Sequence, residues 1–66
     1  MNTITRLGRA LYGDRWISLV AADLRISERT VRRWAAGTYD PPATVLAELR
    51  AIVAKRAADM VEIARD

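Results

Sequence analysis

Residues 16–37, WISLVAADLRISERTVRRWAAG, decide the fold of this 66-residue chain. Apolar residues in the first part of the stretch recur at the spacing of one helical face: Ile17, Val20, Ala21 and Leu24. Ser27 is a favoured N-cap and Gly37 a favoured stop, so a second short helix is predicted over residues 28–36. Because only about three residues separate the two helices, we expect them to meet at a corner.

The outward face of the second helix carries most of the charge in this stretch. At about 100° per residue, Val31 and Trp34 fall on one side, which we predict to be buried. The opposite side carries three arginines around the small residue Ala36: Arg29, Arg32 and Arg33. We expect no acidic residue four positions away to neutralise these arginines, so the face is suited to bind an anionic partner. Glu28 lies at its edge, where the carboxylate either accepts a hydrogen bond from cytosine N4 or favours the helix dipole.

This corner, with a serine that starts its second helix and a glycine that ends it, resembles the helix-turn-helix of the phage Cro and CI repressor class. The resemblance covers residues 16–37. It implies an all-α, lambda-repressor-like domain over residues 1–66, whose second motif helix lies in the major groove of double-stranded DNA. We assign the base contacts to four side chains: Glu28, Arg29, Arg32 and Arg33.

The chain departs from the family pattern at two positions. Arg25 stands where the turn usually has a left-handed glycine, at a cost of about 1 kcal/mol if its φ is positive. Ile17 stands where a phosphate-bound glutamine is common. We expect contacts with the DNA backbone to come from residues around both helices: Arg15, Trp16, Ser18, Ser27, Thr30, Thr38 and Tyr39. Trp16 could instead be a core residue against the first helix, and Tyr39 could pack in the turn.

The arginine-rich segment RTVRRW, residues 29–34, has a second interpretation. Charged residues on an amphipathic helix can form a solvated surface, or a surface that binds an acidic protein. Under this alternative the chain is a small helical protein-interaction module. The salt and sequence dependence of DNA binding separates the two hypotheses.

The rest of the chain is also predicted to be helical, with four helices in all, or five if the last one breaks. Residues 3–12 carry apolar residues at helical spacing and end at Gly13, and Asp14 is the expected N-cap of the next helix. Residues 38–42 form a loop because two prolines disfavour helix before them. Period-two alternation is absent, so no strand is predicted.

The last helix is predicted over residues 42–64 and would be roughly 34 Å long. A chain of this size has a body only about 28 Å across, so this helix overhangs or breaks. Four apolar residues in its second half have little left to cover in a monomer: Ala57, Met60, Val61 and Ala64. They predict a homodimer through this helix. The alternative is that they fold back onto the core as a fifth helix.

Composition limits the remaining function classes. The chain has 11 basic and 8 acidic residues, a net charge of +3, and neither cysteine nor histidine. Disulfides, thiolate or imidazole catalysis and the common zinc sites are excluded, and no catalytic constellation is recognisable, so we expect no enzyme, metal or cofactor. No run approaches the roughly 18 apolar residues of a membrane span, and we expect a cytoplasmic protein without a small-molecule ligand.

The distribution of charge completes the sequence-based hypothesis. Seven of the ten arginines lie in residues 1–37, and the planar guanidinium group suits phosphates and guanine edges. The combined expectation is a dimeric repressor of a phage or mobile-element promoter that reads an inverted-repeat operator.

Overall fold

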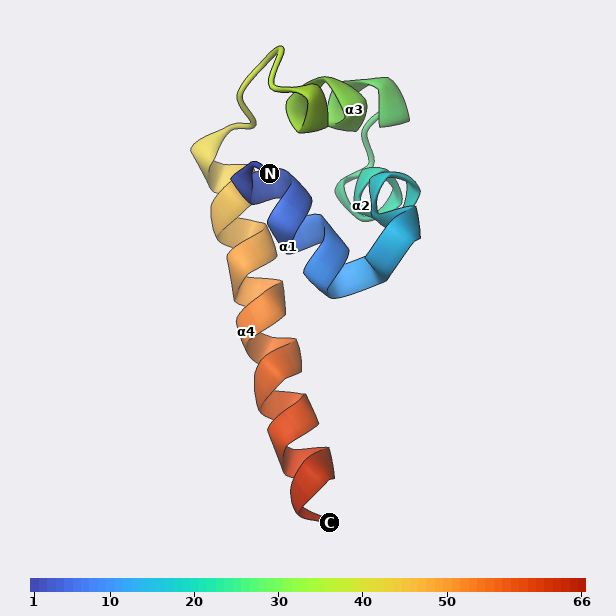
Figure 1. Cartoon of the computed structure of the whole chain (residues 1–66). Helices are drawn as coiled ribbons and strands as arrows, with labels where there is room; N and C mark the ends of the chain where they lie inside the picture. The colour runs from blue at the N-terminus through green and yellow to red at the C-terminus, as the bar shows by residue number, and fades with distance from the viewer.

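The computed structural model describes all 66 residues, and its regular structure is helical throughout (Figure 1). The elements in chain order are α1 (Thr3–Tyr12), a short 3-10 turn η1 (Gly13–Arg15), α2 (Trp16–Leu24), α3 (Glu28–Ala36) and α4 (Ala43–Arg65). There is no strand, so the predicted all-α class is confirmed. Because α4 runs without interruption, the alternative in which its second half folds back as a separate helix is wrong.

The start of α1 and the start of α2 are stabilised in different ways. At α1, the Asn2 side chain accepts a hydrogen bond from the Thr5 amide at 3.1 Å, which satisfies one of the exposed donors of the first turn. The predicted N-cap role of Asp14 is wrong, because this residue lies inside η1 and the N-cap of α2 is Arg15, without a side-chain cap. The 3-10 turn already satisfies the Trp16 amide, which donates to the Gly13 carbonyl.

The core lies where α1, α2, α3 and the first half of α4 meet. It consists of seven buried residues: Ile4, Trp16, Val20, Ala21, Val31, Trp34 and Leu49. Trp16 packs directly on Gly8 of α1, and a Cβ at Gly8 would lie only 2.7 Å from Trp16 Cδ2. A glycine inside a helix is therefore explained here by the close approach of an indole ring.

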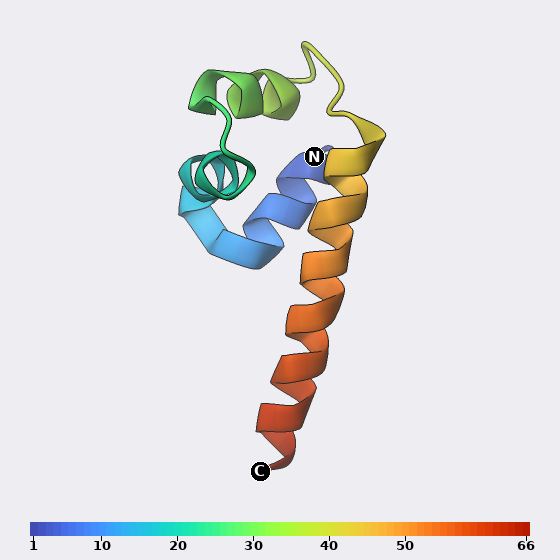
Figure 2. The ribbon, with the colours of Figure 1, turned by 180° about the vertical axis from the view of Figure 1, so that it is seen from behind.

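The helix α4 belongs to two regions of the molecule. Its first half lies along α1 as part of what we call the head (residues 1–53), and the stem (residues 54–65) extends beyond the other helices (Figures 1 and 2). The molecule is 43 Å long and 23 by 21 Å across, with α3 at one end and the C-terminus at the other. No helix combines the length and the apolar content needed to cross a lipid bilayer.

Candidate nucleic-acid interface

Residues 25–27 join α2 to α3 and fix the corner between them. Arg25 has φ 57° and ψ 45°, and it is the one non-glycine residue with a positive φ, so the condition that the sequence left open at this position is met. Its amide donates to the Ala22 carbonyl at 3.3 Å, and the Ile26 amide donates to the Ala21 carbonyl at 3.0 Å. These bonds close the end of α2, while the half-buried Ile26 packs against the core. The turn therefore sets the direction of α3 through the backbone, at a strain cost of about 1 kcal/mol at Arg25.

Both ends of α3 are capped. At the start, Ser27 Oγ accepts a hydrogen bond from the Thr30 amide at 3.2 Å and lies 2.9 Å from the Thr30 hydroxyl oxygen. At the end, Gly37 adopts φ 80°, as its predicted role as a stop requires. The hydroxyl groups of Ser27 and Thr30, which we expected at the DNA backbone, thus also act locally as the helix cap.

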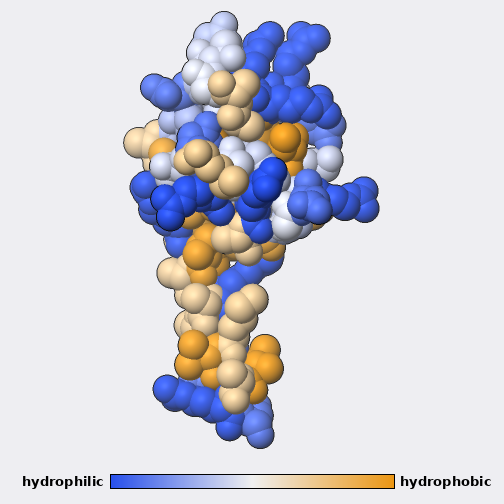
Figure 3. Space-filling model, in the orientation of Figure 1, coloured by the Kyte–Doolittle hydropathy of each residue, from blue (hydrophilic) through white to orange (hydrophobic).

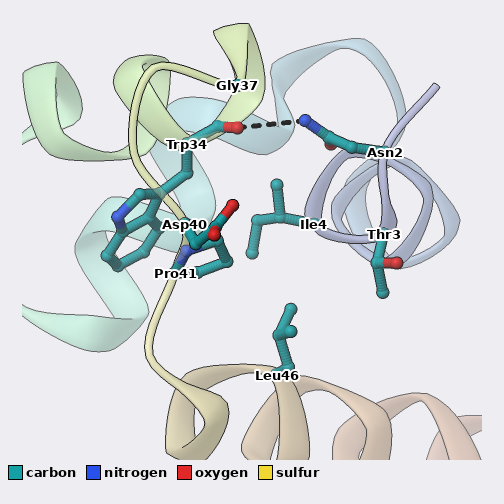
Figure 4. A pocket seen from close by; sticks show the side chains of 8 residues that line it. All are labelled: Asn2, Thr3, Ile4, Trp34, Gly37, Asp40, Pro41 and Leu46. Atoms are coloured by element: carbon teal, nitrogen blue, oxygen red, sulfur yellow. Dashed lines mark hydrogen bonds between the residues drawn. The ribbon is translucent and has the colours of Figure 1, made fainter.

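A second anchor ties the end of α3 to the start of α1 (Figure 4). The Asn2 side-chain amide donates to the carbonyl oxygens of Trp34 at 3.0 Å and Ala35 at 3.1 Å. Carbonyls in the last turn of a helix lack their usual partners four residues on. The Trp34 carbonyl also accepts from the Gly37 amide at 3.1 Å, so Asn2 gives it a second donor and supplies a donor to the Ala35 carbonyl. Asn2 therefore caps α1 with its oxygen and holds α3 with its nitrogen.

The two faces of α3 are separated as the helical arithmetic predicts. Val31 is fully buried and Trp34 is 8% exposed, so the inward face is closed against the core. The three arginines opposite them are exposed: Arg29, Arg32 and Arg33. Hydrophilic residues cover much of the surface at the α3 end of the molecule (Figure 3). A rigid helix thus presents a cationic surface outward, away from the stem.

The arginines of α3 differ in their neighbours. Arg32 Nη2 lies 3.3 Å from the carboxylate of Glu28, so the expectation that no acid neutralises this face is wrong for Arg32. The spacing of Glu28 and Arg32 in the sequence indicates this pair, because residues four apart on a helix are neighbours. The Arg33 guanidinium lies 5.7 Å from the centroid of the Tyr39 ring, and Arg29 makes no ion pair. The face keeps three cationic groups and one partly exposed carboxylate.

The expected backbone-contact residues at α2 fall into two groups. Arg15 and Ser18 are exposed near the start of the helix. Trp16 is only 4% exposed, and its backbone amide already donates to the Gly13 carbonyl. Neither its side chain nor its backbone N–H is therefore available to a phosphate. The structure corrects that assignment and supports the interpretation of Trp16 as a core residue. Beyond α3, Thr38 and Tyr39 are exposed, Tyr39 to 59%.

A pocket of about 240 Å³ lies on the other side of α3, between its last turn, α1 and α4 (Figure 4). Its lining residues are Asn2, Thr3, Ile4, Trp34, Gly37, Asp40, Pro41 and Leu46. It contains none of the arginines, and its one charged side chain is the carboxylate of Asp40. The pocket is therefore separate from the cationic face.

A group of polar side chains, which the sequence did not reveal, links the stem to the head. The Tyr12 hydroxyl donates to the Asp23 carboxylate, and this bond, together with burial and the charge of Asp23, raises the pKa of Tyr12 above its ordinary value of 10.0. Arg56 stacks 5.1 Å from the centroid of the Tyr12 ring and donates to the Leu11 carbonyl at 3.3 Å. The positive charge of Arg56 and its hydrogen bonding act in the opposite direction and lower the pKa of Tyr12. These partners are far apart in the sequence, so no local pattern signals them.

The expected dimer residues lie on the stem. Ala57, Met60, Val61 and Ala64 are all exposed, with Met60 exposed to 66% and Val61 to 51%.

Compared with protein-family models, with curated proteins and with solved structures, the chain matches none. The function must therefore be argued from the chemistry and the placement of its own residues.

Proposed function

We propose that this chain is a sequence-specific DNA-binding transcription regulator in which α2, the turn and α3 act as a helix-turn-helix of the Cro and CI class. The observation that carries the proposal is the exposed face of Arg29, Arg32 and Arg33 on a helix capped at both ends. A B-DNA major groove is about 12 Å wide and admits an α-helix, and arginine binds guanine O6 and N7 in a bidentate manner.

Each charged side chain of α3 has a role in this proposal. Arg29 and Arg33 have no acidic partner and bind guanine edges or phosphates. Arg32 and Glu28 enter the groove as a pair, in which the carboxylate orients the guanidinium and accepts from cytosine N4 when the sequence supplies it. The exposed Arg15, Ser18, Thr38 and Tyr39 contact the flanking phosphates and fix the register of the helix.

The regulatory part of the proposal is repression by operator occupancy. The resemblance to phage repressors supports a phage or mobile-element promoter as the target. The exposed apolar residues of the stem support a homodimer, and a two-fold dimer reads an inverted repeat whose half-sites are about 34 Å apart. The chain acts in the cytoplasm and needs no cofactor under this proposal.

Selection of bound sequences from a random duplex library, followed by titration at several salt concentrations, tests the function. We expect a palindromic consensus and an affinity whose logarithm falls linearly with the logarithm of salt. Arg29→Ala, Arg32→Ala or Arg33→Ala should each weaken binding by about 1–3 kcal/mol and relax the preference at one base pair.

Arg65→Ala is the matched control, because it removes the same charge from an exposed arginine at the end of the molecule farthest from α3. It should leave operator binding unchanged. A loss that is equal for all DNA sequences would reassign the arginine concerned to a phosphate. No enrichment from the library, together with capture of an acidic protein by the arginine face, would replace the proposal with the protein-interaction module.

A further inference from the structure

The pocket beside the end of α3 has walls that belong to the core (Figure 4). Its three apolar side chains come from three helices: Ile4 of α1, Trp34 of α3 and Leu46 of α4. Ile4 is 1% exposed and Trp34 is 8% exposed, and Leu46 packs against the same core cluster. In Figure 4 the side chains of Ile4 and Leu46 point toward each other across the cavity. The apolar walls are therefore held in place by the packing of the head.

The hydrogen-bond donors at the edge of the pocket are largely engaged within the chain. The two N–H groups of the Asn2 side chain donate to the carbonyl oxygens of Trp34 and Ala35. The Gly37 amide donates to the Trp34 carbonyl at 3.1 Å. No lysine or arginine lines the pocket. An anionic ligand would therefore leave water without gaining a cationic partner, which is unfavourable.

Asp40 supplies the one charge of the pocket, and its carboxylate forms no ion pair. The residues that follow it are Pro41 and Pro42, and a residue before a proline is restricted to extended backbone. The segment that carries the carboxylate is therefore stiff. Carboxylates accept strong, charge-assisted hydrogen bonds from ammonium groups. The pocket thus combines apolar walls with one anionic group, and this combination is complementary to a cation on an apolar body.

The volume of the pocket limits the size of that body. The cavity measures about 240 Å³, whereas pockets for drug-sized molecules measure about 300–1,000 Å³. A single ring with a short chain therefore fits better than a larger molecule. An aromatic ring gains additional stabilisation when it packs on the indole of Trp34 in offset or edge-to-face geometry.

We propose that this pocket binds a small primary amine with one aromatic ring. The ring lies among Ile4, Trp34 and Leu46, and the ammonium group donates to the Asp40 carboxylate. The proposal replaces the expectation from the sequence that the chain takes no small-molecule ligand. It is independent of the proposed DNA-binding function, because no arginine of α3 lines the pocket. Because Asp40 is exposed to water, we expect a dissociation constant between micromolar and millimolar.

Titration of the isotope-labelled chain with phenethylamine, followed by NMR, tests this inference. We expect saturable shifts at the indole N–H of Trp34 and at the backbone amides of Ile4 and Asp40. Trp16 does not line the pocket, so its indole N–H is the reference in the same spectra. Hydrocinnamate has the same ring and chain with a carboxylate in place of the ammonium group. It should bind at least about fivefold more weakly, because one partly exposed ion pair is lost.

A pair of variants tests the role of the carboxylate. Asp40→Asn keeps the shape of the side chain and removes its charge, so it should weaken phenethylamine binding about fivefold and leave the two ligands with similar affinities. Asp66→Asn is the matched control, because Asp66 is also exposed without an ion pair and lies at the end of the molecule opposite to α3. It should leave binding unchanged. Equal affinities of the natural chain for the two ligands, equal losses in the two variants, or shifts that do not saturate would overturn the inference.

Discussion

Leu49 in the head and Met60 in the stem are both apolar residues of α4, yet Leu49 is fully buried and Met60 is 66% exposed. The two residues differ by only about 20° in direction around the helix. What differs is the neighbourhood, since α1 lies along the first half of α4, and only the end of α1, at Leu11 and Tyr12, contacts the stem (Figures 1 and 2). Helical periodicity shows that a face exists, and only packing shows whether the same chain covers it.

The sharpest test of this difference compares truncation at the two residues. Leu49→Ala should lower the free energy of unfolding by about 2–5 kcal/mol, because it leaves a cavity in a closed core. Met60→Ala should change it by less than about 0.5 kcal/mol at protein concentrations where the chain is monomeric. Urea denaturation followed by circular dichroism measures both variants. Similar losses at the two positions would show that the stem is packed against the head.

A smaller effect is expected at the contact between α1 and α2 inside the head. Gly8→Ala adds a Cβ that would lie 2.7 Å from Trp16 Cδ2, and such overpacking typically costs about 1–3 kcal/mol. Alanine regains about 1 kcal/mol of helix propensity, so the net change in stability should still be a loss. Thermal unfolding and the fluorescence of Trp16 report it. The control Ala10→Gly, at an exposed site, should show the propensity effect alone, and a Gly8→Ala variant more stable than the natural chain would contradict the indole contact.

The smallest effect concerns the hydrogen bond between Tyr12 at the end of α1 and Asp23 in α2. The Asp23 carboxylate raises the pKa of Tyr12 in the folded state, so above pH 10 the unfolded chain loses this proton first. The stabilising contribution of Tyr12 is therefore complete below pH 10 and is lost as the pH rises through the folded-state pKa. Tyr12→Phe should remove that part of the alkaline decline in stability, measured by denaturation at several pH values. Tyr39→Phe is the control: it leaves the hydrogen bond between Tyr12 and Asp23 in place, so this variant should keep the alkaline decline in stability.

Short-range signals predicted the helix ends and the faces of α3. Ser27 and Gly37 mark the bounds of α3 because a cap acts within one turn, and Val31 and Trp34 lie inward because a helix repeats every 3.6 residues. The pairing of Glu28 with Arg32 is equally local and was available from the sequence. The wrong N-cap at Asp14 arose because a 3-10 turn was not anticipated between α1 and α2.

Other features depend on contacts between distant residues. Trp16 shows no sequence signal that chooses between a DNA contact and the core, and the choice is made by Gly8 on another helix. In the sequence, Arg56 is simply one residue of the predicted last helix. In the structure, its guanidinium group stacks on the Tyr12 ring and donates to the Leu11 carbonyl. Asn2 holds the end of α3 although 32 residues of sequence separate it from Trp34. None of these partners is close enough in the chain to leave a periodic pattern.

The sequence by itself determined that the chain is helical, where α3 begins and ends, and which side of α3 carries the arginines, because caps and periodicity act over a few residues. Only the tertiary structure decided that Trp16 is buried, that α4 runs without interruption, and that its stem lies largely uncovered at the end opposite to α3. Burial depends on how many helices reach a given place, and three short helices can cover only the first half of a helix of 23 residues.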